Sequence, residues 1–223
     1  MNLAVIQETI RNDIKRVGIS KTLFDVIYKA INHVVYLRVL DCVTIKKSDP
    51  RYLEVSNNYT CRFLTNDEIV AFAKFPEYDL EEEAMWLAFK KGDECFAILD
   101  GDRLASYGWY SNQPTTSSEG LVLHFNQAYT YMYQGYTHHD YRGQRLHAIG
   151  MTMALNEYLR RGFKGIVSCV DATNFNSLKS VYRMGYQSFG KLYILKALGQ
   201  CFVYRSPGCK EYGYWLEKIK GQG

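Results

Sequence analysis

Residues 136–147 are the part of the chain whose residue types and spacing best suit a defined chemistry. They read Tyr-Thr-His-His-Asp-Tyr-Arg-Gly-Gln-Arg-Leu-His, follow a strand-like stretch and open a helix predicted over 143–161. An Arg-Gly turn at a helix start presents unpaired backbone N–H groups and the positive end of the helix dipole. Arg142 and Gly143 therefore predict a binding site for an anion such as a phosphate.

A second segment lies about thirty residues further on, where residues 174–186 begin with Asn174 and end in Arg-Met-Gly-Tyr. It is predicted as a helix over 174–184 that Gly185 terminates. In this order and at this spacing, the two segments resemble the two signature motifs of the GNAT superfamily of acyl-CoA-dependent N-acyltransferases. The resemblance extends from residue 59 to about residue 205.

The resemblance implies that the turn at 142–147 holds the pyrophosphate of acetyl-CoA or another acyl-CoA. In the family this turn reads Arg or Gln, two residues, Gly, one residue, then Gly or Ala, and its successive backbone N–H groups bind the pyrophosphate. Arg142 takes the first position, whereas the two small positions fall on Arg145 and His147. Both residues depart from the pattern, and their side chains offer charge-assisted contacts to the same phosphates.

The pantetheine arm is implied to pair, like an added strand, with the end of the strand predicted over 129–137. The gap that admits it lies where this strand splays from the strand predicted over 165–170. Asn174 matches the family's pantetheine-contacting Asn and reads equally well as a helix N-cap. The residues expected to contact the donor are Tyr136, Thr137, His138, Arg142, Gly143, Gln144, Arg145, Leu146, His147 and Asn174.

Acyl transfer from a thioester to an amine needs a neutral amine, a stabilised oxyanion and a proton for the leaving thiolate. Family members often place the acid, a Tyr, four residues before the Gly that ends the second motif. Val181 stands at that position and Tyr182 is its neighbour, so Tyr182 is the candidate acid. His138, at the strand end, is the candidate base because its ordinary pKa lies near neutrality.

Other residues are weaker candidates for catalysis. His124 and Glu119, on the preceding strand and loop, are alternative bases. Cys169 lies in an apolar run without a cue for an activating base, so an acyl-enzyme route is not predicted.

The composition is that of a globular chain: 223 residues, 47% hydrophobic and 22% charged. A net charge of +4 favours an anionic ligand, but the chain lacks the dense Lys/Arg tracts of a nucleic-acid binder. Its six Cys show no metal-binding spacing, so no metal site is predicted. Because we find no signal-peptide pattern and no apolar run of about 20 residues, the expected location is the cytoplasm.

The predicted fold class is α+β: a GNAT-like, mixed and mostly antiparallel central sheet flanked by helices. Residues 3 to about 45 are predicted as helices, because Leu3, Ile6, Ile10 and Ile14 recur on one helical face and a similar pattern follows Gly18. We therefore divide the chain into an N-terminal helical extension, residues 1–55, and a GNAT-like acyltransferase domain, residues 56–223. The extension fits a helical lid, a dimer element or simple packing.

The local signals beyond residue 59 are more specific. A Thr-Asn-Asp-Glu capping box at 65–68 starts a short helix, and a second helix ends at Gly92. A hairpin is predicted over 95–109, a polar loop over 113–120, and later strands over 121–125, 188–196 and 201–205. Tyr129, Tyr131 and Tyr133 alternate onto one strand face, as sheet packing or as the wall of a binding site.

Three functions remain open. The leading one is an N-acyltransferase that moves an acetyl or other acyl group from acyl-CoA to a primary amine of a small molecule by direct attack. The second is a synthase of the N-acyl amino acid or acyl-homoserine-lactone type, fed by an acyl-carrier protein. The third is a non-catalytic GNAT-like binding domain. No motif identifies the acceptor, and both a monomer and a homodimer fit the sequence.

Overall fold

The computed structural model describes residues 3–56, 58–117 and 120–219. Its α-helices are α1 (Leu3–Val17), α2 (Ile19–Asn32), α3 (Asn66–Ala73), α4 (Glu82–Lys91), α5 (Leu146–Arg160) and α6 (Phe175–Arg183). Its strands are β1 (Tyr36–Ile45), β2 (Tyr59–Phe63), β3 (Glu94–Asp100), β4 (Arg103–Ser111), β5 (Thr115–Thr116), β6 (Leu121–His124), β7 (Thr130–Thr137), β8 (Ile166–Asp171), β9 (Gln187–Ala197), β10 (Gln200–Arg205) and β11 (Trp215–Lys218). A 3-10 turn, η3 (His139–Tyr141), joins β7 to α5.

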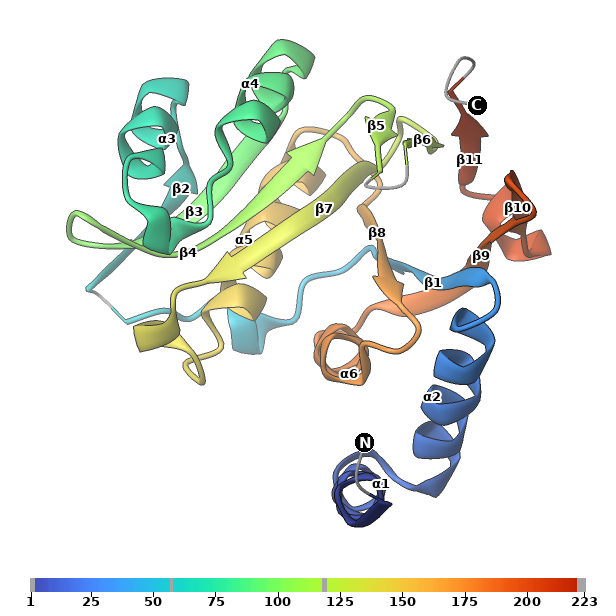
Figure 1. The fold of residues 1–223 in the computed structure, drawn as a ribbon. Coiled ribbons are helices and arrows are strands. Elements are labelled where there is room, and N and C mark those ends of the chain that lie inside the picture. The colour runs from blue at the N-terminus through green and yellow to red at the C-terminus, as the bar shows by residue number, and fades with distance from the viewer. Residues whose placement is uncertain (1–2, 57, 118–119, 220–223) are drawn as a thin grey trace.

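Within the described residues, eight strands form one sheet in the order β10-β9-β1-β8-β7-β4-β3-β2 (Figure 1). Strands β11, β6 and β5 form a smaller second sheet. Neighbours in the large sheet run antiparallel, except β7 and β8, which run parallel. The predicted α+β class with a mixed, mostly antiparallel sheet is therefore confirmed.

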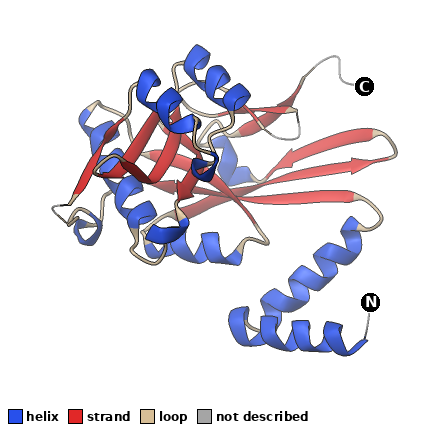
Figure 2. Ribbon diagram, turned by 60° about the vertical axis from the view of Figure 1, so that its left-hand side comes forward, coloured by secondary structure: helices blue, strands red, loops and turns tan. Residues whose placement is uncertain are grey.

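Helices cover both faces of the large sheet (Figure 2). Because side chains of a strand alternate between faces, β3 contributes to two layers. Ile98 packs with Leu155 of α5 and Val181 of α6 on one face, whereas Leu99 packs in the layer of Met85 of α4 on the other face.

The small sheet covers the half of the large sheet that α3 and α4 leave open. Leu123 of β6 and Leu216 of β11 pack in one cluster with Leu40 of β1, Tyr131 of β7 and Val167 of β8. The two strands of the parallel pair, β7 and β8, thus run beneath the boundary between α4 and the small sheet.

The helical prediction for residues 36–45 is wrong, because this segment is strand β1. It pairs antiparallel with β8 on one side, from Leu40 opposite Asp171 to Ile45 opposite Ile166, and with β9 on the other. A strand buried on both faces reads as a nearly continuous apolar run, which periodicity cannot distinguish from a buried helix. The helical part of the N-terminal segment is confined to α1 and α2, which form an arm that projects from the start of β1 (Figures 1 and 2).

The capping prediction is confirmed in detail. Thr65 accepts the Glu68 amide N–H, and the Glu68 side chain accepts the amide N–H of Thr65, as a capping box requires. The hydrogen bond from Arg62 comes first among the causes that lower the pKa of Glu68 to about 2. Gly92 closes α4 in the left-handed conformation, as predicted.

Three smaller differences separate the observed elements from the predicted ones. The loop predicted over 113–120 contains the short strand β5, Thr115–Thr116. Helix α5 begins at Leu146 rather than at residue 143, because Gly143 and Arg145 adopt positive φ angles of 85° and 61°. Strand β11 was not predicted from the sequence. In the described residues, no helix combines the length and apolarity that a bilayer crossing needs.

Candidate active site

The parallel pair β7–β8 opens shortly after it forms. Its register covers only Thr130 opposite Ile166 and Tyr131 opposite Val167, although β7 continues to Thr137. The next contact between the two strands is made by a side chain: the Ser168 hydroxyl donates to the Met132 carbonyl at 2.8 Å. The expected splay between these two strands is therefore present in the structure.

A β-bulge lies at the same place. In the pairing of β4 with β7, Tyr110 lies opposite Met132 and Trp109 opposite Gln134, so Tyr133 is an extra residue in β7. Bulges bend a strand and leave the extra residue out of the ladder, and they are frequent next to active sites. Here the bulge turns β7 away from β8 at the point where their pairing ends.

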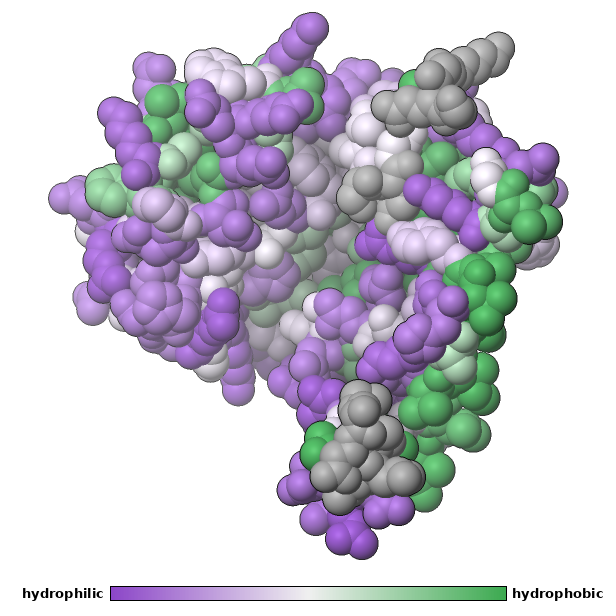
Figure 3. All heavy atoms as spheres, in the orientation of Figure 1, coloured by the Kyte–Doolittle hydropathy of each residue, from purple (hydrophilic) through white to green (hydrophobic). Residues whose placement is uncertain are grey.

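A cleft of about 460 Å³ occupies the region where the strands diverge. Figure 3 shows the molecular surface hollowed between the α3–α4 side and the small sheet. The cleft is lined by Arg38, Leu40, Ala84, Thr115, Thr116, Ser117, Leu123, Tyr131, Tyr133, Gln134, Cys169, Asp171, Ile194 and Leu216. Two of the three alternating tyrosines, Tyr131 and Tyr133, pack in the core and also form a wall of the cleft. Both interpretations of these residues, sheet packing and a binding wall, therefore apply to them.

An ion pair with a buried carboxylate, Asp93, lies at one side of this cleft. Asp93 accepts hydrogen bonds from the Tyr133 hydroxyl at 2.9 Å and pairs with Lys91 Nζ at 3.0 Å. Lys91 also donates to the Thr115 hydroxyl of β5 at 2.8 Å. Burial, followed by the charge of Asp93, raises the pKa of Tyr133 well above its ordinary value, so this phenol stays protonated. The network joins α4, β5 and β7 around the cleft.

A guanidinium and a carboxylate line the cleft on the β1–β8 side. Arg38 Nε donates to Asp171 Oδ2 at 3.1 Å, and the other oxygen, Oδ1, accepts the Thr173 hydroxyl at 2.7 Å. Asp171 is the last residue of β8, and Arg38 reaches it from the neighbouring strand β1. The sequence analysis missed both residues. A carboxylate that ends a buried strand was the available signal for Asp171, whereas Arg38 lay in the segment taken for a helix.

The turn before α5 leaves a run of backbone N–H groups unpaired. The first helical bond is from the Ile149 N–H to the Arg145 carbonyl, and within the described residues no bond engages the N–H groups of residues 143–148. Residues 142–145 are exposed. Arg145 has the left-handed backbone conformation that glycine adopts easily, with φ of 61°. The turn therefore has the backbone form of an anion-binding helix start, although a large residue stands in it.

His147, the other departure from the family pattern, turns its ring toward β7. A Cβ atom placed on Gly135 would lie 2.3 Å from Cε1 of His147, so the imidazole fills the space left by this glycine. Burial lowers the pKa of His147 below its ordinary value, which favours the neutral ring. His147 therefore presents its amide, rather than a cationic side chain, to a ligand at the turn.

The remaining donor-site candidates have partners within the chain. Arg142 Nε donates to the Thr137 carbonyl at 3.4 Å, and the Tyr59 hydroxyl donates to Gln144 Oε1 at 2.7 Å. Leu146 is buried as the first residue of α5. Asn174 caps α6 by accepting the Ser177 N–H at 3.1 Å, which confirms its N-cap interpretation and leaves its donor contact a prediction.

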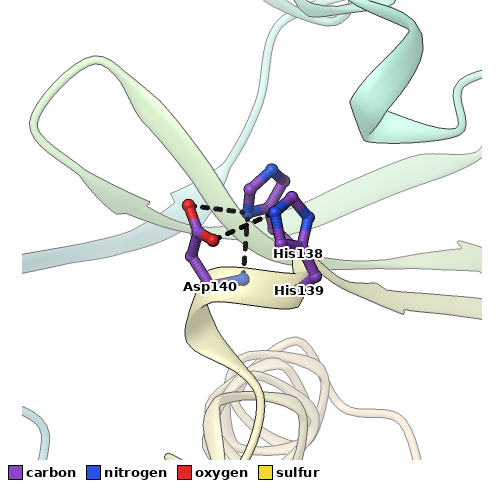
Figure 4. Close-up of side chains that lie close together, drawn as sticks. All are labelled: His138, His139 and Asp140. Carbon is purple, nitrogen blue, oxygen red and sulfur yellow. Dashed lines mark hydrogen bonds and ion pairs between the residues drawn. The ribbon is translucent and has the colours of Figure 1, made fainter.

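His138, the candidate base, is buried at the end of β7 and caps η3. Its Nδ1 accepts the Asp140 N–H at 3.4 Å, and its ring lies 4.1 Å from the ring of His139 (Figure 4). The ligand atoms of His138, His139 and Asp140 lie within 4.8 Å of one another. The cap and the ion pair between Asp140 and Arg103 at 2.8 Å explain this arrangement without a metal ion.

Tyr182, the candidate acid, points at β1. Its hydroxyl donates to Asp41 Oδ2 at 2.7 Å, and burial together with this hydrogen bond raises the pKa of Tyr182 to about 12. The neighbouring Val181 is buried in the core beneath α6. One residue rotates a helix by about 100°, which accounts for the different directions of the two side chains. Neither Tyr182 nor His138 is among the described residues that line the cleft.

The alternative bases lie elsewhere or outside the described residues. His124 Nε2 pairs with Glu217 Oε2 at 2.7 Å across β6 and β11, and its ring stacks on Trp215. Glu119 lies outside the described residues. Cys169 lines the cleft, and its sulfur lies 3.5 Å from the Tyr131 hydroxyl.

Comparison with known proteins gives a family match and several distant structural similarities. A family model described as the acetyltransferase (GNAT) family matches residues 52–186. No curated protein sequence matches the chain. A Drosophila protein of known structure is 12% identical with a TM-score of 0.48, over 79% of this chain, which spans 57% of that protein's length.

Two further structures are similar at the same level. One is an acetyltransferase assigned to the GNAT family from Novosphingobium aromaticivorans, with 14% identity, a TM-score of 0.48, and coverage of 83% of this chain and 67% of that one. The other is an aminoglycoside acetyltransferase from an uncultured soil metagenomic sample, with 13% identity, a TM-score of 0.44, and coverage of 58% and 88%.

The family match spans more than half of the 223 residues and includes both motif segments, the turn at 142–147 and helix α6. The chain therefore belongs to the GNAT family of acetyltransferases.

Proposed function

We propose that this acyltransferase moves an acetyl or other acyl group from acyl-CoA to a primary amine of a small molecule by direct attack. The observation that carries the proposal is that a cleft and a run of unpaired backbone amides lie at two points along β7. The cleft lies beside Tyr131 and Tyr133, and the unpaired amides of residues 143–148 follow the end of the strand. The strand from Tyr133 to Thr137 spans about 13 Å, which lets one extended ligand reach both features.

The backbone of β7 supports a path for the pantetheine arm. The His138 N–H donates to the Ala105 carbonyl of β4 at 3.0 Å. In an antiparallel pair, alternate residues direct their N–H and C=O groups to the same neighbour. His138 and Tyr136 therefore face β4, and the groups of Gly135 and Thr137 face the side from which β8 has diverged. An amide-containing arm would pair there in the manner of an added strand.

The diphosphate would lie at the turn, on the amides of residues 143–148 and the side chains of Arg142 and Arg145. Both guanidinium groups belong to exposed residues beside the N-terminus of α5, where the helix dipole also favours negative charge. A charge-assisted hydrogen bond of this kind contributes about 1.5–3 kcal/mol. Asn174, at the start of α6, is a further proposed donor contact.

The chemistry is a direct exchange of a C–S for a C–N bond. The neutral amine attacks the thioester carbonyl to form the C–N bond, the C–S bond breaks, and the proton that the attacking nitrogen loses is balanced by one that the thiolate takes up, which leaves an amide and free CoA. We assign amine recognition to Asp171, a carboxylate that lines the cleft and that would accept the proton of a bound ammonium. Tyr182 as acid and His138 as base stay proposals, and both would act through intervening solvent because neither lines the cleft.

The first experiment follows donor binding and thiol release. At a hundredfold excess over its dissociation constant, acetyl-CoA is expected to stabilise the folded protein by about 2.7 kcal/mol. Release of free thiol that depends on added amine would support the proposal. Stabilisation by an acylated carrier protein but by no acyl-CoA would replace it with the carrier-dependent synthase. Binding without turnover across an amine panel would replace it with a binding domain.

Three variants separate the roles. Asp171→Asn is expected to lower turnover by about 100-fold, the lower end for a proton-transfer group, with donor binding unchanged. Arg142→Ala should weaken donor binding and spare the chemical step. Tyr182→Phe lowers turnover without affecting binding if its hydroxyl supplies the proton, and unchanged turnover removes it from that role.

The location that we propose is the cytoplasm. All six cysteines are free thiols, as expected in a reducing compartment.

A further inference from the structure

Helix α2 presents its polar face to its own protein. The least exposed side chains of α2 are Thr22, Asp25, Tyr28 and Asn32, whose spacing of three or four residues defines one helical face. The Tyr28 hydroxyl accepts the Val39 N–H at 3.2 Å, and Asn32 Oδ1 accepts the Leu37 N–H at 3.0 Å. Thr22 is the buried residue of this helix. Polar groups therefore attach α2 to β1.

The apolar face of α2 points to solvent. Ile19, Leu23, Val26 and Ala30 follow one another at steps of four, three and four residues, and Val34 continues the row in the turn after α2. All five are exposed; we call these five residues the outer stripe. The exposed fraction is 71% for Ile19, 57% for Leu23 and 86% for Val34. A helix on the surface of a globular protein normally turns such a stripe toward the core. In α2 the two faces are reversed, which indicates that another surface covers the stripe.

The exposed apolar surface approaches the size of one side of a protein interface. Among the described residues up to Val34, nine large apolar residues are between 37% and 86% exposed, and seven of them lie in 19–34. A full aliphatic side chain gains up to about 3 kcal/mol on burial at about 25 cal/mol per Å², which corresponds to roughly 120 Å², so these residues together present on the order of 600 Å². The largest apolar patch of a typical monomer is about 300–600 Å², and a standard interface buries about 800 Å² on each partner.

The surface continues from the arm to the edge of the sheet. Figure 3 shows apolar surface along α2 and up to the end of the β9–β10 hairpin. Tyr36, Leu198, Phe202 and Tyr204 are exposed there, and β10 is the edge strand of the large sheet. An exposed apolar edge is a site where chains associate unless it is covered.

The charges of α2 favour a protein partner over an anionic membrane. A membrane-surface helix offers free Lys and Arg side chains around its apolar face. Here the Lys29 ammonium pairs with Asp25 at 2.7 Å, and Lys21 lies 5.6 Å from the ring centroid of Phe175 in α6. Both cations of α2 are therefore engaged within the chain, and Asp25 adds a negative charge to the opposite face of the helix.

The spacing of the outer stripe fits a second copy of the same helix as its partner. Steps of three and four residues are those of a coiled-coil seam, in which each side chain inserts between residues of a facing helix with the same pattern. A second copy of this chain supplies that helix, and a symmetric pair buries the same patch on both copies. We propose that the protein is a symmetric homodimer in which α2 packs along α2 of the second copy, with the outer stripe as the seam.

The test is the oligomeric state of the full chain. Light scattering after gel filtration is expected to give twice the monomer mass for the native protein and the monomer mass for Leu23→Glu. The matched control is Leu87→Glu on α4, where an exposed leucine of 61% lies outside the patch, and this variant should stay dimeric. Circular dichroism checks that each variant is folded. Should Leu23→Glu fail to fold, Val34→Glu, beyond the end of α2, tests the same seam.

A monomeric native protein at 100 µM would overturn the proposal, and so would a dimer that survives both seam variants, since its interface would lie elsewhere. Sedimentation of a monomeric native protein with vesicles of anionic phospholipid would assign the stripe to a membrane instead. A dimer also predicts a melting temperature that rises with protein concentration, and this dependence should disappear in Leu23→Glu.

Discussion

The ring of His147 occupies the space that a side chain at Gly135 would need. A Cβ atom there would lie 2.3 Å from Cε1 of His147 and 2.8 Å from Cε of Met132. Gly108 of β4 lies directly opposite Gly135 in the sheet. The donor turn thus accommodates His147 at a position where the family pattern has a small residue, because Gly135 on the facing strand β7 has no side chain.

We expect Gly135→Ala to destabilise the fold by about 1–3 kcal/mol, the usual cost of overpacking. The added methyl group would have to displace the buried imidazole ring of His147. Urea unfolding measures this loss, and the second-site change His147→Ala should restore most of it. Equal stability of Gly135→Ala and the native protein would mean that the ring does not fill this space.

Gly150 offers a matched control in helix α5. Its added Cβ atom would meet Cδ1 of Ile98 at 3.5 Å, an ordinary contact distance. Alanine also lowers the entropy cost of forming a helix, so Gly150→Ala should stabilise the protein by about 0.5–1 kcal/mol. The same substitution is therefore expected to have opposite signs at two glycines near the donor turn.

His147 should make the protein less stable in acid. Burial lowers its folded pKa below the value of 6.5 that it has when unfolded, so the unfolded chain binds the proton more readily. The neutral ring of His147 makes its full contribution to the free energy of unfolding above about pH 6.5, and this contribution is lost as the pH falls through the folded pKa. Between pH 8 and pH 5, the free energy of unfolding should fall more in the native protein than in His147→Asn. A constant difference between the two proteins over this range would contradict the assignment.

Arg145 should combine a cost in stability with a gain in binding. Its left-handed backbone, with φ of 61°, costs a non-glycine residue about 1–2 kcal/mol. Arg145→Gly is therefore expected to raise the melting temperature and, by removing a cation at the turn, to raise the KM for acyl-CoA about tenfold. Gly143, with φ of 85° and open space around it, supplies the opposite test, since Gly143→Ala should lower stability. An Arg145→Gly protein that melts at a lower temperature would count against the strained turn.

The ion pair between Asp93 and Lys91 should contribute more to the free energy of unfolding than the hydrogen bond that Tyr133 donates to Asp93. The Asp93 side chain is 1% exposed and pairs with Lys91, so Asp93→Asn leaves a cation without its partner and should cost about 1–3 kcal/mol. Tyr133→Phe removes one neutral donor and should cost about 0.5–1.5 kcal/mol. Unfolding of both single variants and the double variant gives the coupling energy. No coupling would mean that the network does not hold the cleft together.

Local signals in the sequence were sufficient to predict most elements beyond residue 59. The capping box at Thr65 and Glu68 and the terminal Gly92 act through neighbours in the chain, so they are visible without tertiary structure. Strand β1 was missed because it lies inside the sheet, paired with β8 at one edge and β9 at the other, and from Val39 on its side chains are buried on both faces. Such a segment has no strand periodicity.

The candidate site likewise has one part that is local in the sequence and one part that depends on the fold. The turn at 142–147 is a local motif, and its unpaired amides could be predicted. The cleft combines residues from separate elements, such as Arg38 of β1 and Asp171 of β8, and their proximity depends on strand order. The direction of Tyr182 also required the structure, because a shift of one helical position decides whether a side chain faces the core or Asp41.

The central claim is that the backbone amides of residues 143–148 hold the diphosphate of the acyl donor. The most direct measurement is a titration of isotope-labelled protein with CoA, and in parallel with pantetheine, which carries no phosphate, followed by the amide resonances of these six residues. The account predicts that CoA shifts them strongly and that pantetheine leaves them nearly unchanged while shifting those of Gly135 and Thr137. Binding of CoA that leaves residues 143–148 unshifted would contradict it.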